Sequence, residues 1–331
     1  MMTVLSKELT VSEISNIWSS YLKNSMELQF FTYFFQTAED RKIKKIAGRL
    51  LHQSEKNLKQ LQDFFSKENL SVPRGFTEKD VRINGQKLFS DHFILFFCHD
   101  ITQLSLSTYP SALSESTRKD IRNYFEITLK FTLKIQNEIV DLMLSKGIYQ
   151  EHPKLKMEDR IDFARSLKYL NGFKGGSRPL NAPEIANISR IIHRAQFSKM
   201  IFVTFSTIAE SNEMKDHFSK GRDLIEKVLS SLRDIMENEH IPLSSSGDYQ
   251  IFDVDTPPFS EKIMLFFVNT CLGIFCFTMI SQALTSSLRS DIVIKLLSIS
   301  KDMSLFYGKG LLIAIKQKWL EQPPQPAGRQ V

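Results

Sequence analysis

The sequence predicts an all-α fold that consists of two tandem four-helix bundles. The chain has 331 residues, which is enough for two domains of ordinary size. Glycine (13 residues) and proline (11 residues) are scarce, and this favours long helices over a turn-rich β fold. The chain also aligns with itself at a nearly constant shift, which indicates that one structural unit occurs twice.

The internal repeat covers most of the chain. Residues 9–68 align without a gap to residues 180–239, a shift of 171 residues, and sixteen of the sixty pairs are identical. Two later pairs of segments match in the same order: FSDHFILFF (89–97) with FSEKIMLFF (259–267), and ALSESTRKDI (112–121) with ALTSSLRSDI (283–292). Chance does not give matches in the same order at nearly one offset, so each copy is expected to fold in the same way.

Each copy is predicted to contain four helices, A to D. Helix A begins at a capping box, Thr10-x-x-Glu13 in the first copy and Asn181-x-x-Glu184 in the second. The predicted ranges of helices A to D are 10–38, 40–69, 88–109 and 114–147 in the first copy, and 181–209, 211–240, 259–282 and 286–319 in the second.

The connections between these helices predict their directions. Short A–B and C–D turns join neighbouring antiparallel helices, whereas a B–C connection of about 18 residues can run the length of the bundle. Helices B and C are therefore expected to be parallel. This is the connectivity of ferritin-like bundles, so the predicted fold class is two tandem ferritin-like four-helix bundles.

The predicted domain order follows from the repeat. We expect the first bundle at 1–147, a linker at 148–180 with a short helix near 159–170, the second bundle at 181–321, and a proline-rich disordered tail at 322–331.

Three segments carry a resemblance to a known family: RPLNAPEI (178–185), PPFSEKIMLF (257–266) and KWLEQPPQ (318–325). They resemble an uncharacterised family of two-repeat proteins from spore-forming Gram-positive bacteria. That family is placed among the ferritin-like folds and is distantly similar to spore-coat proteins. The resemblance implies a fold and a spore association, with spore-coat proteins as partners, but no activity.

Composition narrows the function classes. The net charge of +6 is mild and the two signs are interspersed, so no nucleic-acid partner is predicted. The N-terminus has no basic region followed by an apolar stretch, and the odd number of cysteines does not suggest a disulfide framework, so a cytoplasmic location is expected. The apolar run 263–284 is long enough for a membrane span. Its first-copy counterpart contains Asp91 and Asp100, which favours a buried bundle helix.

A dimetal centre of the ferritin type requires a Glu from each of two helices and a Glu-x-x-His from each of the other two. The predicted helices contain no Glu-x-x-His motif, and the nearest signal is the reversed His52-x-x-Glu55. A helical wheel places these two residues, together with Glu27 and Glu126, on outer surfaces. Accordingly, neither a metal site nor a cofactor is predicted.

The predicted interior of the first bundle is unusually polar. Its tentative ligand-binding residues are Ser25, Gln29, Ser54, Asp100 and Thr128, and their second-copy counterparts are mostly apolar. A buried carboxylate such as Asp100 needs hydrogen-bonding partners. Two interpretations stay open: a hydrogen-bonded network with one or two buried waters, or a small polar ligand or lone cation.

Helix A carries a second apolar face, which includes Phe30 and Phe34 in the first copy and Phe202 and Phe205 in the second. Aligned exposed aromatic residues usually mark an interface. These residues are expected to pack beneath the B–C connection, against the other copy, or against another chain by self-association.

The sequence therefore predicts a non-catalytic structural or binding protein, with a sporulation role taken from the family resemblance alone. The alternative is a ferritin-like dimetal oxidoreductase that acts on oxygen or peroxide. A weaker alternative is a basic protein that associates with nucleic acid.

Overall fold

The computed structural model describes residues 8–83, 86–159, 161–172, 178–243 and 250–326. The chain divides into two compact units that are not consecutive in sequence. Unit 1 contains residues 1–148, 248–263 and 317–331, and unit 2 contains residues 149–247 and 264–316. The described residues form helices and connecting segments with two isolated β-bridges, so the prediction of an all-α tandem fold is confirmed.

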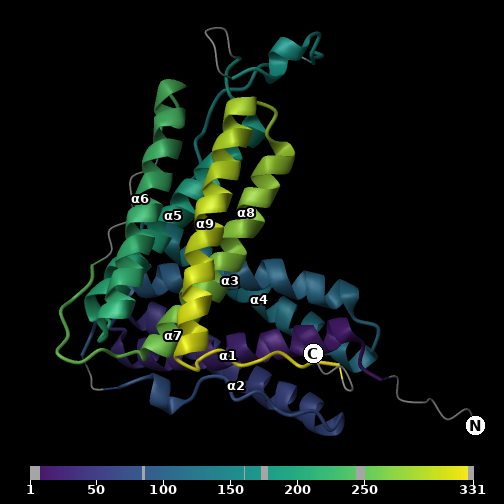
Figure 1. Cartoon of the computed structure of the whole chain (residues 1–331), viewed down its shortest axis with the longest axis vertical. Coiled ribbons are helices and arrows are strands. Elements are labelled where there is room, and N and C mark those ends of the chain that lie inside the picture. The colour runs from purple at the N-terminus through teal and green to yellow at the C-terminus, as the bar shows by residue number, and fades with distance from the viewer. Residues whose placement is uncertain (1–7, 84–85, 160, 173–177, 244–249, 327–331) are drawn as a thin grey trace, which may run out of the picture. The chain divides into compact units, whose positions relative to one another are not determined.

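Unit 1 contains a four-helix bundle (Figure 1). Its helices are α1 (Val11–Thr37), α2 (Arg41–Lys67), α3 (Asp91–Glu115) and α4 (Lys119–Ser145), and a short 3₁₀ helix, η1 (Glu78–Asp80), lies between α2 and α3. The expected capping box is present, because the Thr10 side chain accepts a hydrogen bond from the backbone of Glu13 and the Glu13 side chain accepts one from the backbone of Thr10.

An ion pair at one end of this bundle and a hydrogen bond at the other fix the helix directions. Arg118, which follows α3, pairs with Glu68 at the end of α2 at 2.5 Å. At the opposite end, the backbone N–H of Asp40, which precedes α2, donates to the carboxylate of Asp91 at the start of α3. The starts of α2 and α3 thus lie together, and so do their ends. The two helices are parallel, as the long connection predicts.

The long connection of the first copy is covered by a segment of the second copy. Within unit 1, Val81 forms an antiparallel bridge with Phe259, and Phe89 forms one with Ile251. The ring of Phe259 also lies 4.5 Å from that of Phe30 on α1, measured between centroids. This segment therefore completes the aromatic core of unit 1.

Unit 2 repeats the arrangement (Figure 1). Its helices are α5 (Ala182–Ile208), α6 (Asn212–Asn238), the end of α7 (Glu261–Phe266), a π-helical segment η3 (Phe267–Leu272), α8 (Gly273–Ser286) and α9 (Ser290–Lys316). Residues 261–263 of α7 belong to unit 1, and α7, η3 and α8 are continuous. Arg289, which follows α8, forms an ion pair with Glu239 at the end of α6. The ends of α6 and α8 therefore lie next to each other, as the ends of α2 and α3 do in unit 1.

The π-helical segment accommodates one extra residue. Directly before this segment the shift between copies is 170 residues (89–97 against 259–267), and after it the shift is 171 (112–121 against 283–292). A single insertion within an α-helix is commonly absorbed as one π-helical turn. Here the turn presents Asn269 to α9, where its side-chain amide donates to the backbone oxygen of Tyr307 at 3.2 Å. Gly310 makes room for this side chain, because a Cβ at that position would lie 2.3 Å from the Asn269 Oδ1 atom.

The linker and tail differ in part from the predicted segments. In the described part of 159–170, the only helical element is a 3₁₀ turn, η2 (Leu167–Leu170). Glu321, the last residue of the predicted second bundle, belongs to unit 1, where its carboxylate accepts from the backbone N–H groups of Arg74 (2.8 Å) and Gly75 (3.0 Å). Residues 327–331 of the predicted disordered tail lie outside the described residues.

One helical stretch in the described chain, Glu261–Ser286, is long and apolar enough to cross a membrane by length and composition. In its most apolar window, 61% of the residues are buried within the protein.

Candidate functional site

A buried ion pair lies at the centre of the first bundle. Lys23 and Glu27, one turn apart on α1, form a salt bridge in which Lys23 Nζ lies 2.6 Å from Glu27 Oε1. The same ammonium group donates to Ser105 Oγ at 2.8 Å and to Tyr109 OH at 3.2 Å, both from α3. An ammonium group has three N–H donors, so the three acceptors satisfy it fully.

Burial and charge act in opposite directions on this pair. Burial by itself would lower the pKa of Lys23, but the Glu27 carboxylate and Tyr109 outweigh it and raise that pKa above its ordinary value. Burial raises the pKa of Glu27 by more than Lys23 lowers it.

An amide network lies beside the ion pair and lines the same cavity as Glu27. The Asn57 side-chain amide donates to Asn24 Oδ1 at 2.9 Å, and the Gln53 side-chain amide donates to Asn57 Oδ1 at 2.7 Å. On α4, the hydroxyl of Thr128 donates to Asn57 Oδ1 at 3.5 Å. Side chains from all four helices thus form one buried polar layer.

This layer encloses a cavity of about 20 Å³. Its polar lining residues are Asn24, Glu27, Gln53, Ser54, Asn57, Thr102, Ser105, Tyr109, Thr128 and Thr132. A polar cavity needs roughly 10–15 Å³ to admit one water molecule. The space therefore suits a single water and is too small for an organic ligand.

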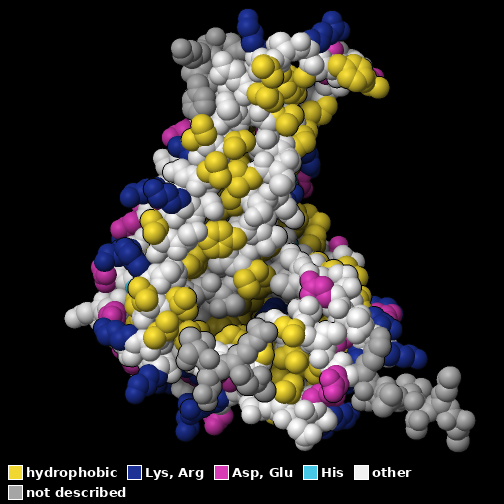
Figure 2. All heavy atoms as spheres, turned by 45° about the vertical axis from the view of Figure 1, so that its right-hand side comes forward, with side chains coloured by type: hydrophobic (Ala, Val, Ile, Leu, Met, Phe, Trp, Pro, Cys, Tyr) yellow, Lys and Arg dark blue, Asp and Glu magenta, His cyan; other side chains and the backbone are white. Residues whose placement is uncertain are grey.

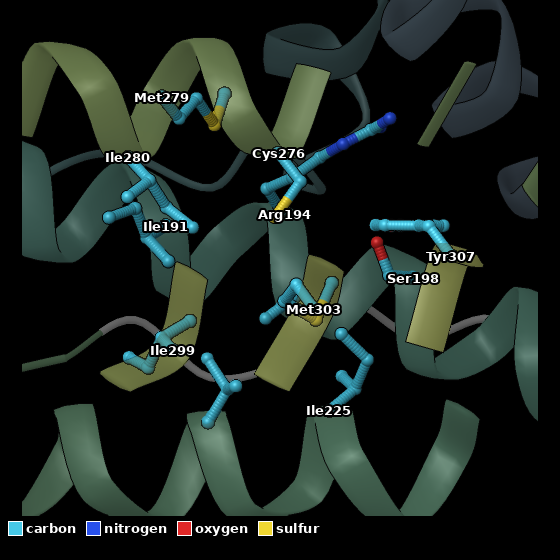
Figure 3. Close-up of a pocket in the computed structure, with 12 residues that line it drawn as sticks. Ile191, Arg194, Ser198, Ile225, Cys276, Met279, Ile280, Ile299, Met303 and Tyr307 are labelled. Atoms are coloured by element: carbon cyan, nitrogen blue, oxygen red, sulfur yellow. The ribbon is translucent and has the colours of Figure 1, made fainter. Parts of the chain in front are cut away.

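The second bundle has a cavity of the same size, about 20 Å³, at the equivalent place (Figure 3). Eight of its lining residues lie 171 positions after lining residues of the first cavity: Ala195, Ser198, Ile225, Val228, Cys276, Ile280, Ile299 and Met303. They replace Asn24, Glu27, Ser54, Asn57, Ser105, Tyr109, Thr128 and Thr132 of the first cavity. The two copies therefore share a central cavity that is polar in one bundle and almost wholly apolar in the other.

Arg194 is the second-copy counterpart of Lys23. Its guanidinium lies over the rings of Phe275 (4.5 Å) and Phe197 (5.4 Å), and it extends away from the apolar side chains of the cavity (Figure 3). Burial lowers the pKa of Arg194 to about 10, which still leaves the group charged at neutral pH. A buried cation is thus kept in both copies, held by hydroxyl groups and a carboxylate in the first and by aromatic rings in the second.

The structure separates the five residues predicted to form one polar site. Ser54 and Thr128 line the first cavity. Ser25 instead faces the connection between α2 and α3, where its hydroxyl accepts from the backbone N–H of Phe76 at 3.1 Å. Gln29 donates to the backbone oxygen of Ser25 at 3.5 Å, and Asp100 is buried but does not line the cavity.

The prediction that Glu27 points outward is wrong, since only 4% of the residue is exposed. A helical wheel assumes one buried face, whereas α1 is buried on nearly every side. His52, Glu55 and Glu126 are exposed as expected. Sequence reasoning also missed Lys23, although a Lys–Glu pair one turn apart within an apolar helix signals an internal ion pair.

The four phenylalanines proposed as an interface are core residues. Phe30, Phe34, Phe202 and Phe205 are each at most 1% exposed. The ring of Phe34 lies 5.8 Å from that of Phe89 in unit 1, and the ring of Phe202 lies 5.5 Å from that of Phe306 in unit 2. Of the expected alternatives, burial within the chain is the one observed. The interface assignment is corrected accordingly.

The residues at the first cavity do not fit a dimetal centre. Ser54 and Asn57 occupy the one-turn spacing on α2 where a Glu-x-x-His pair would be needed, and Thr128 and Phe131 occupy it on α4. Glu27 is the only carboxylate in the lining, and an ammonium group already neutralises it. Throughout the described parts of the chain, no group of three or more His, Cys, Asp or Glu side chains could hold a metal ion.

The fold and the two central cavities define a class of protein: an all-α tandem-repeat protein whose two bundles share a plan but differ in core chemistry. The chain belongs to the family described as "Protein of unknown function (DUF3231)", whose model matches residues 2–161 and 169–330, once for each repeat.

A solved structure of a "putative spore coat protein" from Bacillus halodurans is similar to part of this chain, with a TM-score of 0.40 and 15% sequence identity. The match covers 46% of this chain and 98% of that one. Among curated proteins, none matches the sequence.

Proposed function

We propose that this protein has a non-catalytic structural or binding role, in which its two bundles act as rigid helical modules. The observation that carries the proposal is the buried ion pair of Lys23 and Glu27, in which the ammonium group has all its partners inside the bundle. A catalytic or ligand-binding centre keeps some polar groups available to a substrate. Here all three donors of the Lys23 ammonium group are used inside the bundle.

The difference between the two cavities supports the same role. A reaction centre imposes particular side chains, whereas a packing position tolerates any set that fills the space and satisfies its own polar atoms. Asn57 and Thr128 are replaced by Val228 and Ile299 at the same place in the fold. The polar layer therefore acts as an internal hydrogen-bonded core, which can fix the register of the helices.

The rival function, a dimetal oxidoreductase, can be tested directly. The full chain is purified without chelator, and its iron, manganese and zinc are measured by elemental analysis. We expect well below one metal ion per chain. Near-stoichiometric iron or manganese that is lost in Glu27→Gln would contradict the proposal, and the exposed variant Glu55→Gln is the matched control.

A spore-associated role is a further part of the proposal, and it rests on the family resemblance of the sequence alone. The test is an immunoblot of vegetative cytoplasm and of extracted spore layers from a spore-forming host that expresses the chain. We expect the protein to be enriched in the spore fraction. A protein confined to the vegetative cytoplasm would contradict this role and would leave the structural role untouched.

A further inference from the structure

The last helix, α9, is apolar on two opposite sides. One side packs into the second bundle through buried residues that include Leu296, Ile299 and Met303. The opposite side carries a second row, which we call the outer stripe: Ile294, Leu297, Leu305, Leu312 and Ile315. These five residues are 53–67% exposed, and the helical period places them on one face. Hydrophobic side chains form a band along the unit that contains α8 and α9 (Figure 2).

The first bundle provides an internal control for this stripe. The equivalent positions in α4, 171 residues earlier, are Asn123, Glu126, Lys134, Asp141 and Leu144. Four of these five are polar or charged, and all five are exposed. The same bundle therefore folds with a polar face at this place, so the outer stripe of α9 is not needed for the fold of its unit.

The outer stripe is symmetric along the helix. Ile294 and Ile315 lie equally far from a midpoint between Ser304 and Leu305, and so do Leu297 and Leu312. A copy of α9 laid antiparallel across this midpoint would place Ile294 against the partner's Ile315 and Leu297 against the partner's Leu312. Such self-complementarity is the requirement for a two-fold interface between identical chains.

Gly308 gives a second, independent indication. It lies in the middle of α9 on the exposed face, where glycine weakens a helix relative to alanine. Apart from its chain neighbours and the nearby backbone of its own helix, no atom of the described residues lies within 4 Å of the position that a Cβ would take, so packing within the unit does not require a glycine. In the antiparallel arrangement, Gly308 falls opposite the partner's Lys301, whose long side chain needs the space.

We propose that the outer stripe of α9 is a self-association surface, on which a second copy of this chain packs in an antiparallel, two-fold arrangement. Five half-exposed Leu and Ile side chains amount to several hundred Å² of apolar surface, the size at which an exposed patch marks an interaction site. Two such faces together would bury an area at the lower end of the range for specific protein interfaces. A dimer of moderate affinity is therefore expected. The inference deepens the proposed structural role by naming the partner.

The test is sedimentation of the full 331-residue chain over a range of protein concentrations. The natural chain is expected to reach twice its mass of 38.3 kDa as the concentration rises through the micromolar range. Leu305→Asp should weaken the dimer by at least about thirtyfold, since residues at the centre of an interface carry most of its affinity. Lys134→Asp, the matched position in the first bundle, should leave association unchanged.

A second variant keeps the test decisive if Leu305→Asp impairs folding. Gly308→Gln replaces glycine with a good helix former in open space, so the helix itself should be at least as stable. It should nevertheless weaken the dimer, because it fills the gap opposite the partner's Lys301. Unchanged association in Gly308→Gln, or a natural chain that stays monomeric at about 100 µM, would overturn the proposal.

A membrane surface is the competing occupant of an apolar helix face with nearby lysines. Flotation with phosphatidylglycerol vesicles distinguishes the two. A natural chain that dimerises and does not float supports the proposal, whereas a monomer that floats only with Leu305 intact overturns it. Neither outcome depends on metal content, so failure here is distinguishable from failure of the proposed non-catalytic role.

Discussion

The Glu13 carboxylate accepts a hydrogen bond from the backbone N–H of Arg118 at 2.8 Å, although the two residues are 105 positions apart. Arg118 is the N-cap of α4 and has no side-chain acceptor for its own helix. Glu13 instead binds the backbone N–H of the N-cap residue itself while it also closes the capping box of α1. The second unit repeats the relationship between Glu184 and Arg289, at 3.0 Å and the same separation. One glutamate therefore caps two helices in each bundle.

Replacement of either capping glutamate should destabilise the protein. Glu13→Ala and Glu184→Ala each remove a fully buried carboxylate and leave several backbone N–H groups without their acceptor. We expect a loss of roughly 2–4 kcal/mol in the free energy of unfolding for each change. Urea unfolding followed by circular dichroism measures the loss. The exposed Glu126→Ala is the control, and a loss no larger than that of the control would show that the double cap is dispensable.

The second unit should lose stability in acid. Burial by itself would raise the pKa of Glu184, but Arg178 and the backbone N–H groups of Asn181, Leu288 and Arg289 outweigh it and lower that pKa to about 2, against an ordinary value of 4.5. A carboxyl group with a lowered pKa stabilises the fold above its unfolded pKa. The contribution, on the order of 3 kcal/mol, is therefore lost as the pH falls from about 4.5 toward 2.

The acid prediction is checked by urea unfolding at a series of pH values. Glu184→Gln keeps one side-chain oxygen and removes the titrating group, so its stability should depend less on pH in this window. A pH dependence identical to that of the natural chain would show that Glu184 is not responsible.

Loss of one member of the buried ion pair should destabilise the protein more than loss of both members. Lys23→Met leaves the Glu27 carboxylate buried without its cation, and about 3–5 kcal/mol of stability should be lost. The double change Lys23→Met with Glu27→Met removes both charges and should cost much less, because an apolar pair of similar volume fills the space. A double-mutant cycle measured by urea unfolding gives the coupling. Additive effects of the two single changes would contradict the tight pairing at 2.6 Å.

Replacement of His52 and Glu55 should have little effect. Their side chains are 83% and 55% exposed, and the ring nitrogen lies 3.5 Å from the carboxylate. His52→Ala with Glu55→Ala should change the unfolding free energy by no more than about 0.5 kcal/mol, as is usual for surface sites. Thermal unfolding of the double variant measures this. A loss of several kcal/mol would mean that these side chains have a partner that the exposed geometry does not show.

The sequence by itself determined the repeat, the helices and their directions. The capping boxes at Thr10 and Asn181 mark where α1 and α5 begin, because these signals act within a few residues of the chain. The length of the connection between α2 and α3 determined that the two helices are parallel. The repeat also indicated that the first core is polar and the second apolar, since equivalent positions in the two copies can be compared directly in the sequence.

Only the tertiary structure decided which polar side chains meet. Periodicity assigns one buried face to a helix, but α1 is covered on several sides by α2, by α3 and by the segment around Phe259. Glu27 is therefore buried against expectation, and Ser25 faces Phe76 instead of the bundle centre. The segment that covers α1 comes from the second repeat, more than 200 residues along the chain. Local patterns cannot predict such a contact, because it depends on how distant segments pack in space.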